Sequence, residues 1–426
     1  MQTTNRFARY LIHLEISWQH NRQIIAIRRA LRLIFPLVLL GSLAEVINEA
    51  WLQTNGYYYQ TLHVAKWVLQ LRLAREYLRL ISAGTLGLVA VFMAFAVSFY
   101  LVVPSTQRTT DRLMAGITAV ISLKFFNISR SSVLTSRPIS WLSTDLGLTG
   151  VLLGILVGLL VGNTYRWCLD RQQNDEDLGL TLTVTSGWLL GTAALGLLWI
   201  STQTTSINTI FTGMLRGAFR LPHLLLGLVG FSALSSLYQW LGMLGPITIG
   251  GQSMESTQNL AAVLNHHGWQ LPHPITVHTI VDVYAEFGGS GMLLGLLLAI
   301  FIVRGTQRQQ RVGWLSLVPT LGNVGAPLMV GLPVILSPLL GIPFLLAPLA
   351  TVSLSWLCVR LAWVPAVAYP LATGAPGPLL AYLGTGGNWA ALALALVDLA
   401  LSTAIYYPFV KWQQMAQLEG GGTDEA

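Results

Sequence analysis

Residues 319–333 read P-T-L-G-N-V-G-A-P-L-M-V-G-L-P, in a chain that is otherwise almost continuously apolar. Three prolines and three glycines among these fifteen residues interrupt a regular helix. In a bilayer, each backbone group that such a break frees must find a partner in protein or in a water-filled cavity. Apolar residues flank the stretch on both sides, which favours membrane depth over an external loop. The stretch therefore predicts part of a substrate path.

The composition is that of a polytopic membrane protein. Hydrophobic residues make up 53% of the 426 residues and charged residues 10%, whereas soluble proteins carry about 25% charged residues. The net charge of +7 gathers in short arginine-bearing segments, which is typical of cytoplasmic loops rather than of a nucleic-acid partner. These arginines are Arg6, Arg9, Arg22, Arg28, Arg29, Arg32, Arg166, Arg171, Arg304, Arg308 and Arg311. We predict a multi-pass protein of the cytoplasmic membrane with a cytoplasmic N-terminus.

The apolar segments predict an all-α membrane protein of about ten transmembrane helices with two re-entrant hairpins, since a bilayer crossing needs about 20 apolar residues. The expected spans are 33–51, 82–103, 113–131, 144–165, 180–201, 221–242, 277–303, 334–361 and 389–409. Shorter, broken apolar segments lie at 244–251, 314–333 and 364–383. Residues 207–221 place apolar side chains at helical spacing among Arg216 and Arg220, which predicts an interfacial helix, with a connecting loop as the alternative.

Four short blocks of sequence follow one another along the chain. They are I-R-R-A-L-R-L-I-F-P-L-V-L-L-G-S-L at 27–43, G-G-S-G at 288–291 with Gly295, N-V-G-A-P-L-M-V-G-L-P at 323–333, and S-T-A-I-Y-Y-P-F-V at 402–410. With these blocks the chain resembles the membrane component (enzyme IIC) of the bacterial phosphotransferase system, in its lactose, cellobiose and diacetylchitobiose branch. The resemblance covers nearly the whole chain and is stronger in its second half.

The resemblance implies an N-terminal bundle that forms a homodimer and a C-terminal transport domain that carries an oligosaccharide such as cellobiose, lactose or diacetylchitobiose. It also implies IIA and IIB partner proteins that phosphorylate the sugar. We therefore expect a cytoplasmic N-terminal segment, a membrane bundle, an amphipathic connecting helix, a substrate domain and a cytoplasmic tail. Their expected bounds are 1–32, 33–205, 206–221, 222–410 and 411–426.

Two positions depart from the family's pattern. The block that corresponds to G-I-H-G reads G-M-L-G at 242–245, so Leu244 stands in place of the histidine. The block that corresponds to N-x-x-E-P reads N-V-G-A-P, so Ala326 stands in place of the glutamate. The resemblance implies that these two groups serve the sugar hydroxyl during phosphoryl transfer. Leucine and alanine side chains can neither take a proton nor accept a hydrogen bond.

Other polar residues are candidates for contact with a sugar. Asp282 and Glu286 are four residues apart, so on a helix they would share a face, and ionisable groups at membrane depth are usually functional. The full predicted site is Asp282, Glu286, Gly288, Gly289, Ser290, Asn323, Gly325, Ala326 and Leu244. It contains no catalytic residue, and we expect neither a metal nor a cofactor. Weaker candidates are Glu45, Glu49, Lys124 and Asp398, and the loop histidines His266, His267, His273 and His278 lack the convergence that a metal needs.

These observations predict a phosphotransferase-type sugar permease, with its enzymatic role left open by Leu244 and Ala326. One hypothesis is transport without coupled phosphorylation. An alternative is a sensor or scaffold that keeps the fold, binds sugar and does not transport. An unrelated secondary transporter is a third reading, but the sequence shows no ion site that would favour it.

Overall fold

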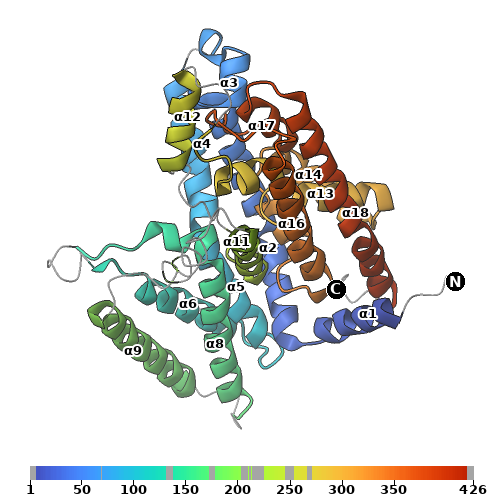
Figure 1. The fold of residues 1–426 in the computed structure, drawn as a ribbon. Coiled ribbons are helices and arrows are strands. Elements are labelled where there is room, and N and C mark those ends of the chain that lie inside the picture. Colours follow the sequence, from blue (N-terminus) through green and yellow to red (C-terminus); the bar gives the residue numbers. More distant parts are fainter. Residues whose placement is uncertain are drawn as a thin grey trace.

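The computed structural model describes residues 6–68, 70–130, 138–171, 178–202, 210, 213, 225–244, 254–265 and 271–419. In these ranges the protein is built from helices, with two isolated bridges and no strand (Figure 1). Six described helices are long and apolar enough to cross a membrane: Arg22–Leu52, Leu71–Val102, Leu148–Leu169, Thr181–Thr202, Pro338–Arg360 and Trp389–Glu419. Leu225–Leu241 and Leu293–Val303 are shorter apolar helices. The predicted all-α polytopic fold is confirmed.

The first half of the chain forms a helical bundle around α5. Its helices are α1 (Arg6–Gln19), α2 (Arg22–Ile47), α3 (Tyr57–Thr61), α4 (Leu71–Thr85), α5 (Val89–Val102), α6 (Thr109–Phe126), α8 (Val151–Leu169) and α9 (Leu178–Thr202). The π-helix η1 (Asn48–Leu52) continues α2. A Cβ added at Gly154 would lie 2.5 Å from Ala90 O, and one at Gly158 would lie 2.9 Å from Ala94 O. Glycines on α8 therefore let its backbone approach α5 closely, as is common between membrane helices.

Helix α2 begins earlier than the hydropathy of its residues predicts. The expected first span starts at residue 33, but α2 starts at Arg22, where the Asn21 side chain accepts a hydrogen bond from Gln23 N at 2.9 Å. Residues 6–19 form α1, which packs against α16 (Pro338–Arg360) and α18 (Trp389–Glu419) of the second half (Figure 1). The arginines near the start of α2 interrupt its apolar run without interrupting the helix, because arginine is a good helix former.

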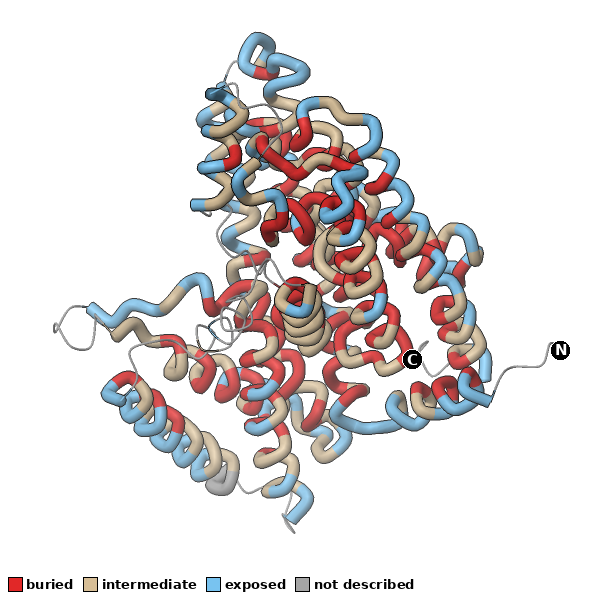
Figure 2. The backbone as a smooth tube through the Cα atoms, in the orientation of Figure 1, coloured by how far each residue is buried: buried red, intermediate tan, exposed pale blue. Residues whose placement is uncertain are grey.

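The second half packs around a large apolar core. Its helices are α11 (Leu225–Leu241), α12 (Met254–Leu264), η6 (His278–Ala285), α13 (Leu293–Val303), α14 (Gln307–Leu321), α15 (Ala326–Gly331), α16 (Pro338–Arg360), α17 (Gly377–Gly384) and α18 (Trp389–Glu419). Figure 2 shows buried residues concentrated where these helices meet, while α9 stays largely exposed along its length. Helix α2 borders both halves, because it packs against α5 and α4 on one side and against α15 and α14 on the other.

The single span expected over 277–303 is wrong. The chain instead forms the π-helix η6, breaks after Ala285, and resumes as α13. Between them Gly288, Gly289 and Gly291 have φ values of +79°, +91° and +78°. Only glycine adopts such values readily, so the G-G-S-G block turns the chain inside an apolar stretch that a hydropathy window reads as continuous.

The break predicted over 319–333 is present but starts later than its first proline. Pro319 lies inside α14, which ends at Leu321. The turn itself spans 322–325, with Asn323 at φ 64°, and α15 follows with proline near its start. Pro319 removes a single backbone donor, and a membrane helix tolerates that loss. A residue with a left-handed backbone conformation, such as Asn323, cannot continue the helix.

Some sequence predictions lie outside the described residues. They are the connecting helix over 206–221 apart from residues 210 and 213, the 244–251 segment beyond Leu244, and His266 and His267.

Candidate functional site

The two helix breaks meet backbone to backbone. Gly288 N donates to Asn323 Oδ1 at 2.9 Å, and Asn323 Nδ2 donates to Ala375 O at 3.4 Å. A Cβ at Gly289 would lie 3.1 Å from Gly325 N, and one at Gly325 would lie 2.7 Å from Gly288 O. The structure therefore brings together four of the predicted site residues. Glycine is required on both sides because any side chain would push the breaks apart.

Polar side chains surround the turn at 288–291. Ser290 Oγ accepts a hydrogen bond from Gln239 Nε2 at 2.5 Å, and the Ser290 side chain also interacts with the Glu286 carboxylate. Glu286 Oε1 is buried and has no hydrogen-bond partner among the described residues. A buried acceptor without a donor is costly. It is therefore available to a ligand hydroxyl.

Sequence reasoning missed Gln239, although α11 carries a signal for it. Ser232, Ser235, Ser236 and Gln239 are all buried, and their spacing of three, one and three residues places them along one stripe of the helix. A polar stripe on an otherwise apolar membrane helix indicates a face turned toward protein or a polar path. The last member of this stripe contacts the predicted site.

Buried aromatic residues hold the 288–291 turn in place. Tyr406 donates its hydroxyl hydrogen to Gly291 O, and a Cβ at Gly291 would collide with the Phe344 ring. Phe287 N donates to Met292 Sδ at 3.2 Å. Tyr406 lies in the last of the four sequence blocks, so the structure explains why that block accompanies the G-G-S-G block.

Asp282 and Glu286 do not share a regular helix face. The residues of η6 follow a π-helix rather than an α-helix, and Glu286 lies beyond it in extended backbone. The Asp282 side chain is 46% exposed and pairs with His278 Nδ1 at 3.2 Å. The four-residue spacing was interpreted with α-helical geometry, which this segment lacks. Glu286 is therefore the buried acceptor of the two.

The two positions that the resemblance marks as departures, Leu244 and Ala326, occupy apolar surroundings. Leu244 is 7% exposed and Ala326 is 5% exposed, and both belong to the large core cluster. Ala326 opens α15 directly after Gly325. Leu244 N donates to Leu148 O at 3.1 Å, at the start of η5 (Leu148–Gly150), which leads into α8. Neither side chain offers a hydrogen-bonding group at its position.

Three of the weaker candidates have partners of their own. Asp398 is fully buried and accepts from Ser355 Oγ at 2.6 Å, and Lys124 Nζ lies 4.1 Å from the centroid of the Trp141 ring. His273 Nε2 pairs with Gln258 Oε1 at 2.7 Å. Within the described ranges, no three His, Cys, Asp or Glu residues cluster as metal ligands would.

Comparison with known proteins places these features in a family. The family model described as "Phosphotransferase system, EIIC" matches residues 28–348. The lichenan permease IIC component of Bacillus subtilis (strain 168) is 29% identical over 156 residues, which cover 36% of this chain and 34% of that protein. The cellobiose-specific EIIC component of Lactococcus lactis subsp. lactis (strain IL1403) is 34% identical over 129 residues, covering 30% of this chain and 26% of that protein.

Two relatives that align over nearly the whole chain have lower sequence identity. The oligo-beta-mannoside-specific EIIC component of Bacillus subtilis (strain 168) is 24% identical over 430 residues, covering 95% of this chain and 93% of that protein. The crystal structure of the IIC component from the N,N'-diacetylchitobiose-specific phosphotransferase system aligns with 98% of this chain and 100% of its own, at 21% identity and a TM-score of 0.43. The stronger matches span well under half of their relatives' length. Because the family model covers residues 28–348 of 426, this chain belongs to the EIIC family of the phosphotransferase system.

Proposed function

We propose that the chain is a sugar permease that moves a β-linked oligosaccharide, of the cellobiose, lactose or diacetylchitobiose kind, across the cytoplasmic membrane without coupled phosphorylation. The observation that carries this proposal is a contrast between the backbone of the two turns and two apolar side chains. The backbone frame of Gly288, Gly289, Asn323 and Gly325 is closed by direct contacts, while Leu244 and Ala326 fill the positions of the family's histidine and glutamate with buried apolar side chains.

The remaining polar groups support sugar binding. Glu286 offers a buried oxygen without a partner among the described residues, and Gln239, Ser290 and Asn323 line the same turn region. Sites that hydrogen-bond hydroxyls discriminate by roughly 4 to 5 orders of magnitude against ligands that lack them. Loss of two such groups weakens binding, while the retained groups still orient a sugar.

The missing groups bear on the chemistry more than on the binding. A sugar hydroxyl that attacks a phosphoryl group must give up its proton, and a positioned base contributes typically 10²–10⁴-fold to such a step. Neither Leu244 nor Ala326 can act as that base. We infer that IIA and IIB partners meet a site that binds sugar and fails to activate it.

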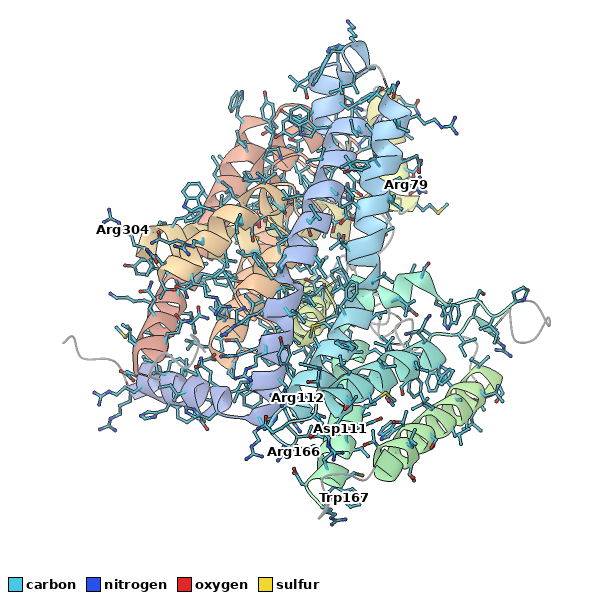
Figure 3. All side chains as sticks on the ribbon, turned by 180° about the vertical axis from the view of Figure 1, so that it is seen from behind. Arg79, Asp111, Arg112, Arg166, Trp167 and Arg304 are labelled. Atoms are coloured by element: carbon cyan, nitrogen blue, oxygen red, sulfur yellow. The ribbon has the colours of Figure 1, made fainter. Side chains whose placement is uncertain are left out.

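The predicted orientation draws support from one part of the bundle. Figure 3 shows Arg112 and Arg166, with Asp111 and Trp167, near the end of the bundle where α1 lies, and Arg79 toward the other end. Arg304 lies apart from both groups. This gathering of arginines with α1 supports the proposal of a cytoplasmic N-terminus. The homodimer formed by the N-terminal bundle stays a prediction of the resemblance.

The proposal is tested by separating uptake from phosphorylation. Purified chain in proteoliposomes receives radiolabelled cellobiose, lactose or diacetylchitobiose, with phosphorylated IIB and IIA from a cellobiose system on the cytoplasmic side. We expect sugar uptake without sugar phosphate. Sugar phosphate at a family-typical rate contradicts the uncoupled mechanism. Binding without uptake identifies a sensor or scaffold instead, and absence of binding for all three sugars overturns the sugar permease.

A double substitution tests the assigned cause. Leu244→His with Ala326→Glu restores a base and a hydroxyl acceptor, so we expect sugar phosphate to appear in the same assay. The matched control is Leu244→His with Ala326→Gln, which has nearly the same shape and lacks the carboxylate. Equal product from both pairs, or from neither, contradicts the role that we assign to these positions.

A further inference from the structure

Helix α1 buries a carboxylate within its apolar stripe. The buried residues of α1 are Ala8, Leu11, Ile12 and Glu15, which follow the spacing of a helix face turned toward a core. Glu15 is only 1% exposed. A carboxylate at such a position is costly unless donors surround it, so its partners show what α1 is built to hold.

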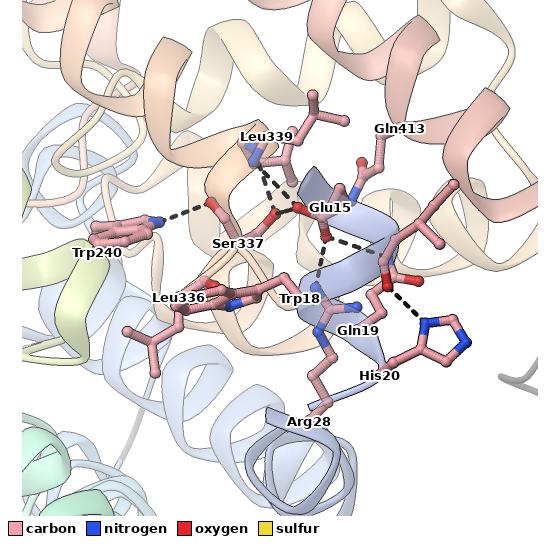
Figure 4. A network of polar contacts seen from close by, with 12 residues as sticks. Glu15, Trp18, Gln19, His20, Arg28, Trp240, Leu336, Ser337, Leu339 and Gln413 are labelled. Carbon is pink, nitrogen blue, oxygen red and sulfur yellow. Dashed lines mark hydrogen bonds and ion pairs between the residues drawn. The ribbon is translucent and has the colours of Figure 1, made fainter. Parts of the chain in front are cut away.

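Glu15 is held by donors from two other helices. Arg28 of α2 lies 2.6 Å from Glu15 Oε1, and Glu15 Oε2 accepts from Ser337 Oγ at 3.1 Å and from Leu339 N at 3.2 Å (Figure 4). Gln19 Nε2 donates to Oε1 at 3.2 Å. Ser337 and Leu339 form the N-terminus of α16, where a negative charge is favourable. The carboxylate therefore ties α2 to the start of α16.

The loop that precedes α16 is closed by two tryptophans. Trp18 Nε1 donates to Leu336 O at 2.8 Å, and Trp240 Nε1 donates to Ser337 O at 3.0 Å. Leu336 N in turn donates to Trp240 O at 3.1 Å. This loop begins three residues after the 319–333 stretch, so its position sets the downstream end of that segment.

The end of α11 that carries Trp240 also contacts the 288–291 turn. Gln239, which precedes Trp240 in α11, donates to Ser290 Oγ. A continuous set of hydrogen bonds thus runs from Glu15 through Ser337 and Trp240 to the last turn of α11, and from there to Ser290. Packed side chains and hydrogen-bond networks of this kind are what carries coupling between two sites where it exists.

We propose that α1 is a latch that positions the 288–291 turn, with Glu15 as the positioning residue that holds the 336–339 loop against the end of α11. Undocking of the Glu15 carboxylate frees this loop, and the Gln239–Ser290 contact loosens with it. The inference rests on the proposed function only in taking Ser290 and Glu286 as sugar contacts. Apolar packing of Leu11 with Leu339 and Phe409 keeps α1 attached when the carboxylate is changed.

The test is amide hydrogen exchange on the full chain in nanodiscs, with Glu15→Gln. Glutamine offers one acceptor oxygen, so it loses either Arg28 or the donors of α16. We expect exchange at 337–340 and also at 287–291 to rise about tenfold, the size expected for loss of a charge-assisted hydrogen bond. Ser17→Ala on the exposed face of α1 and Arg29→Gln beside Arg28 are matched controls that leave both segments unchanged.

A second variant guards against a general loss of fold. Trp18→Phe keeps an aromatic ring and removes one donor to Leu336 O, so the same two segments should respond more weakly. Faster exchange at 337–340 with no change at 287–291 in both variants overturns the latch, as does no change at either segment. Exchange is measured without sugar, so this outcome is independent of the proposed function, and cellobiose affinity is measured separately on the same samples.

Discussion

At the scale of single residues, the predicted site contains one carboxylate with a buried oxygen, that of Glu286. Glu286 Oε1 is buried without a hydrogen-bond partner among the described residues, while its neighbours Ser290, Gln239 and Asn323 are all engaged. An unpaired acceptor costs folding free energy. Residues that keep such a cost at a helix break are candidates for ligand contact, where the partner arrives with the substrate.

Glu286→Leu should therefore weaken sugar binding without harming the fold. We expect the dissociation constant for cellobiose to rise about tenfold or more, the loss expected for a hydrogen bond to a charged group, while the unfolding midpoint stays equal or rises. Equilibrium binding and thermal unfolding of purified protein measure the two quantities. Asp282→Asn, at an exposed carboxylate four residues earlier, is the control and should change neither; a parallel loss of affinity and stability in Glu286→Leu argues for a structural role.

Ser355→Ala should destabilise the packing of α16 on α18. Ser355 Oγ donates to Asp398 Oδ2 at 2.6 Å, and Asp398 Oδ1 has no partner in the described part of the chain. Removal of the Ser355 hydroxyl takes this hydrogen bond from the buried Asp398 carboxyl, which lowers the free energy of unfolding by about 1–3 kcal/mol. Ser353→Ala is the control, because Ser353 Oγ bonds Leu349 O of its own helix at 2.7 Å. Equal midpoints for the two variants would refute this assignment.

At the scale of elements, the site is a meeting of two helix breaks. The turn after η6 and the turn between α14 and α15 approach each other through glycine backbone, and a hydrogen bond joins them. Broken backbone at membrane depth is stable when protein satisfies its freed groups. Asn323 does this directly by accepting from Gly288 N.

Gly288→Ala should disrupt this meeting. Gly288 has φ +79°, and an added Cβ would lie 2.5 Å from Leu294 N. Such strain costs of order 1–3 kcal/mol, and the displaced turn should lose most of its sugar affinity. The comparison is Gly230→Ala on α11, where a Cβ meets nothing within 4 Å. Size-exclusion profiles and cellobiose binding give the readout, and near-native binding by Gly288→Ala would contradict the geometry.

At the scale of the whole molecule, α2 is the border between the two halves. Near its start, Arg28 reaches the α16 terminus through Glu15. Beyond its end, Tyr57 N donates to Thr373 O at 3.0 Å, and Thr373 N donates to Asn55 O at 3.1 Å. Between these two attachments α2 packs against α15. A movement of the second half relative to the first would have to change these contacts.

Close packing of α2 against the 319–333 stretch should be necessary for full sugar uptake. A Cβ at Gly322 would lie 2.8 Å from Val46 Cγ1 and 3.1 Å from Val46 Cγ2. Gly322→Ala should therefore reduce uptake several-fold, since overpacking costs typically 1–3 kcal/mol. Val46→Ala in the same chain removes both methyl groups and should restore much of the loss. Uptake and unfolding of the two single variants and the double variant form the cycle, and additive effects would show that the two residues are not in contact.

The features that could be predicted before the fold was known follow from local chemistry. Hydropathy and the arginine-bearing segments predict a multi-pass helical protein, and prolines and glycines predict the break within 319–333. The apolar residues at 244 and 326 are visible in the sequence itself. These properties belong to short stretches of chain. Reasoning from averaged hydropathy failed over 277–303, because the average conceals a turn that three glycines permit.

Which groups meet depends on the way in which distant helices pack together. Gln239 contacts Ser290, Asn323 contacts Gly288, and Glu15 contacts Ser337, at sequence separations of 51, 35 and 322 residues. No local pattern specifies such partners, because they depend on how helices cross and on where each ends. Glu15 shows this most clearly. In the sequence it is one acidic residue in a basic segment, and in the fold it is a buried carboxylate that joins three helices.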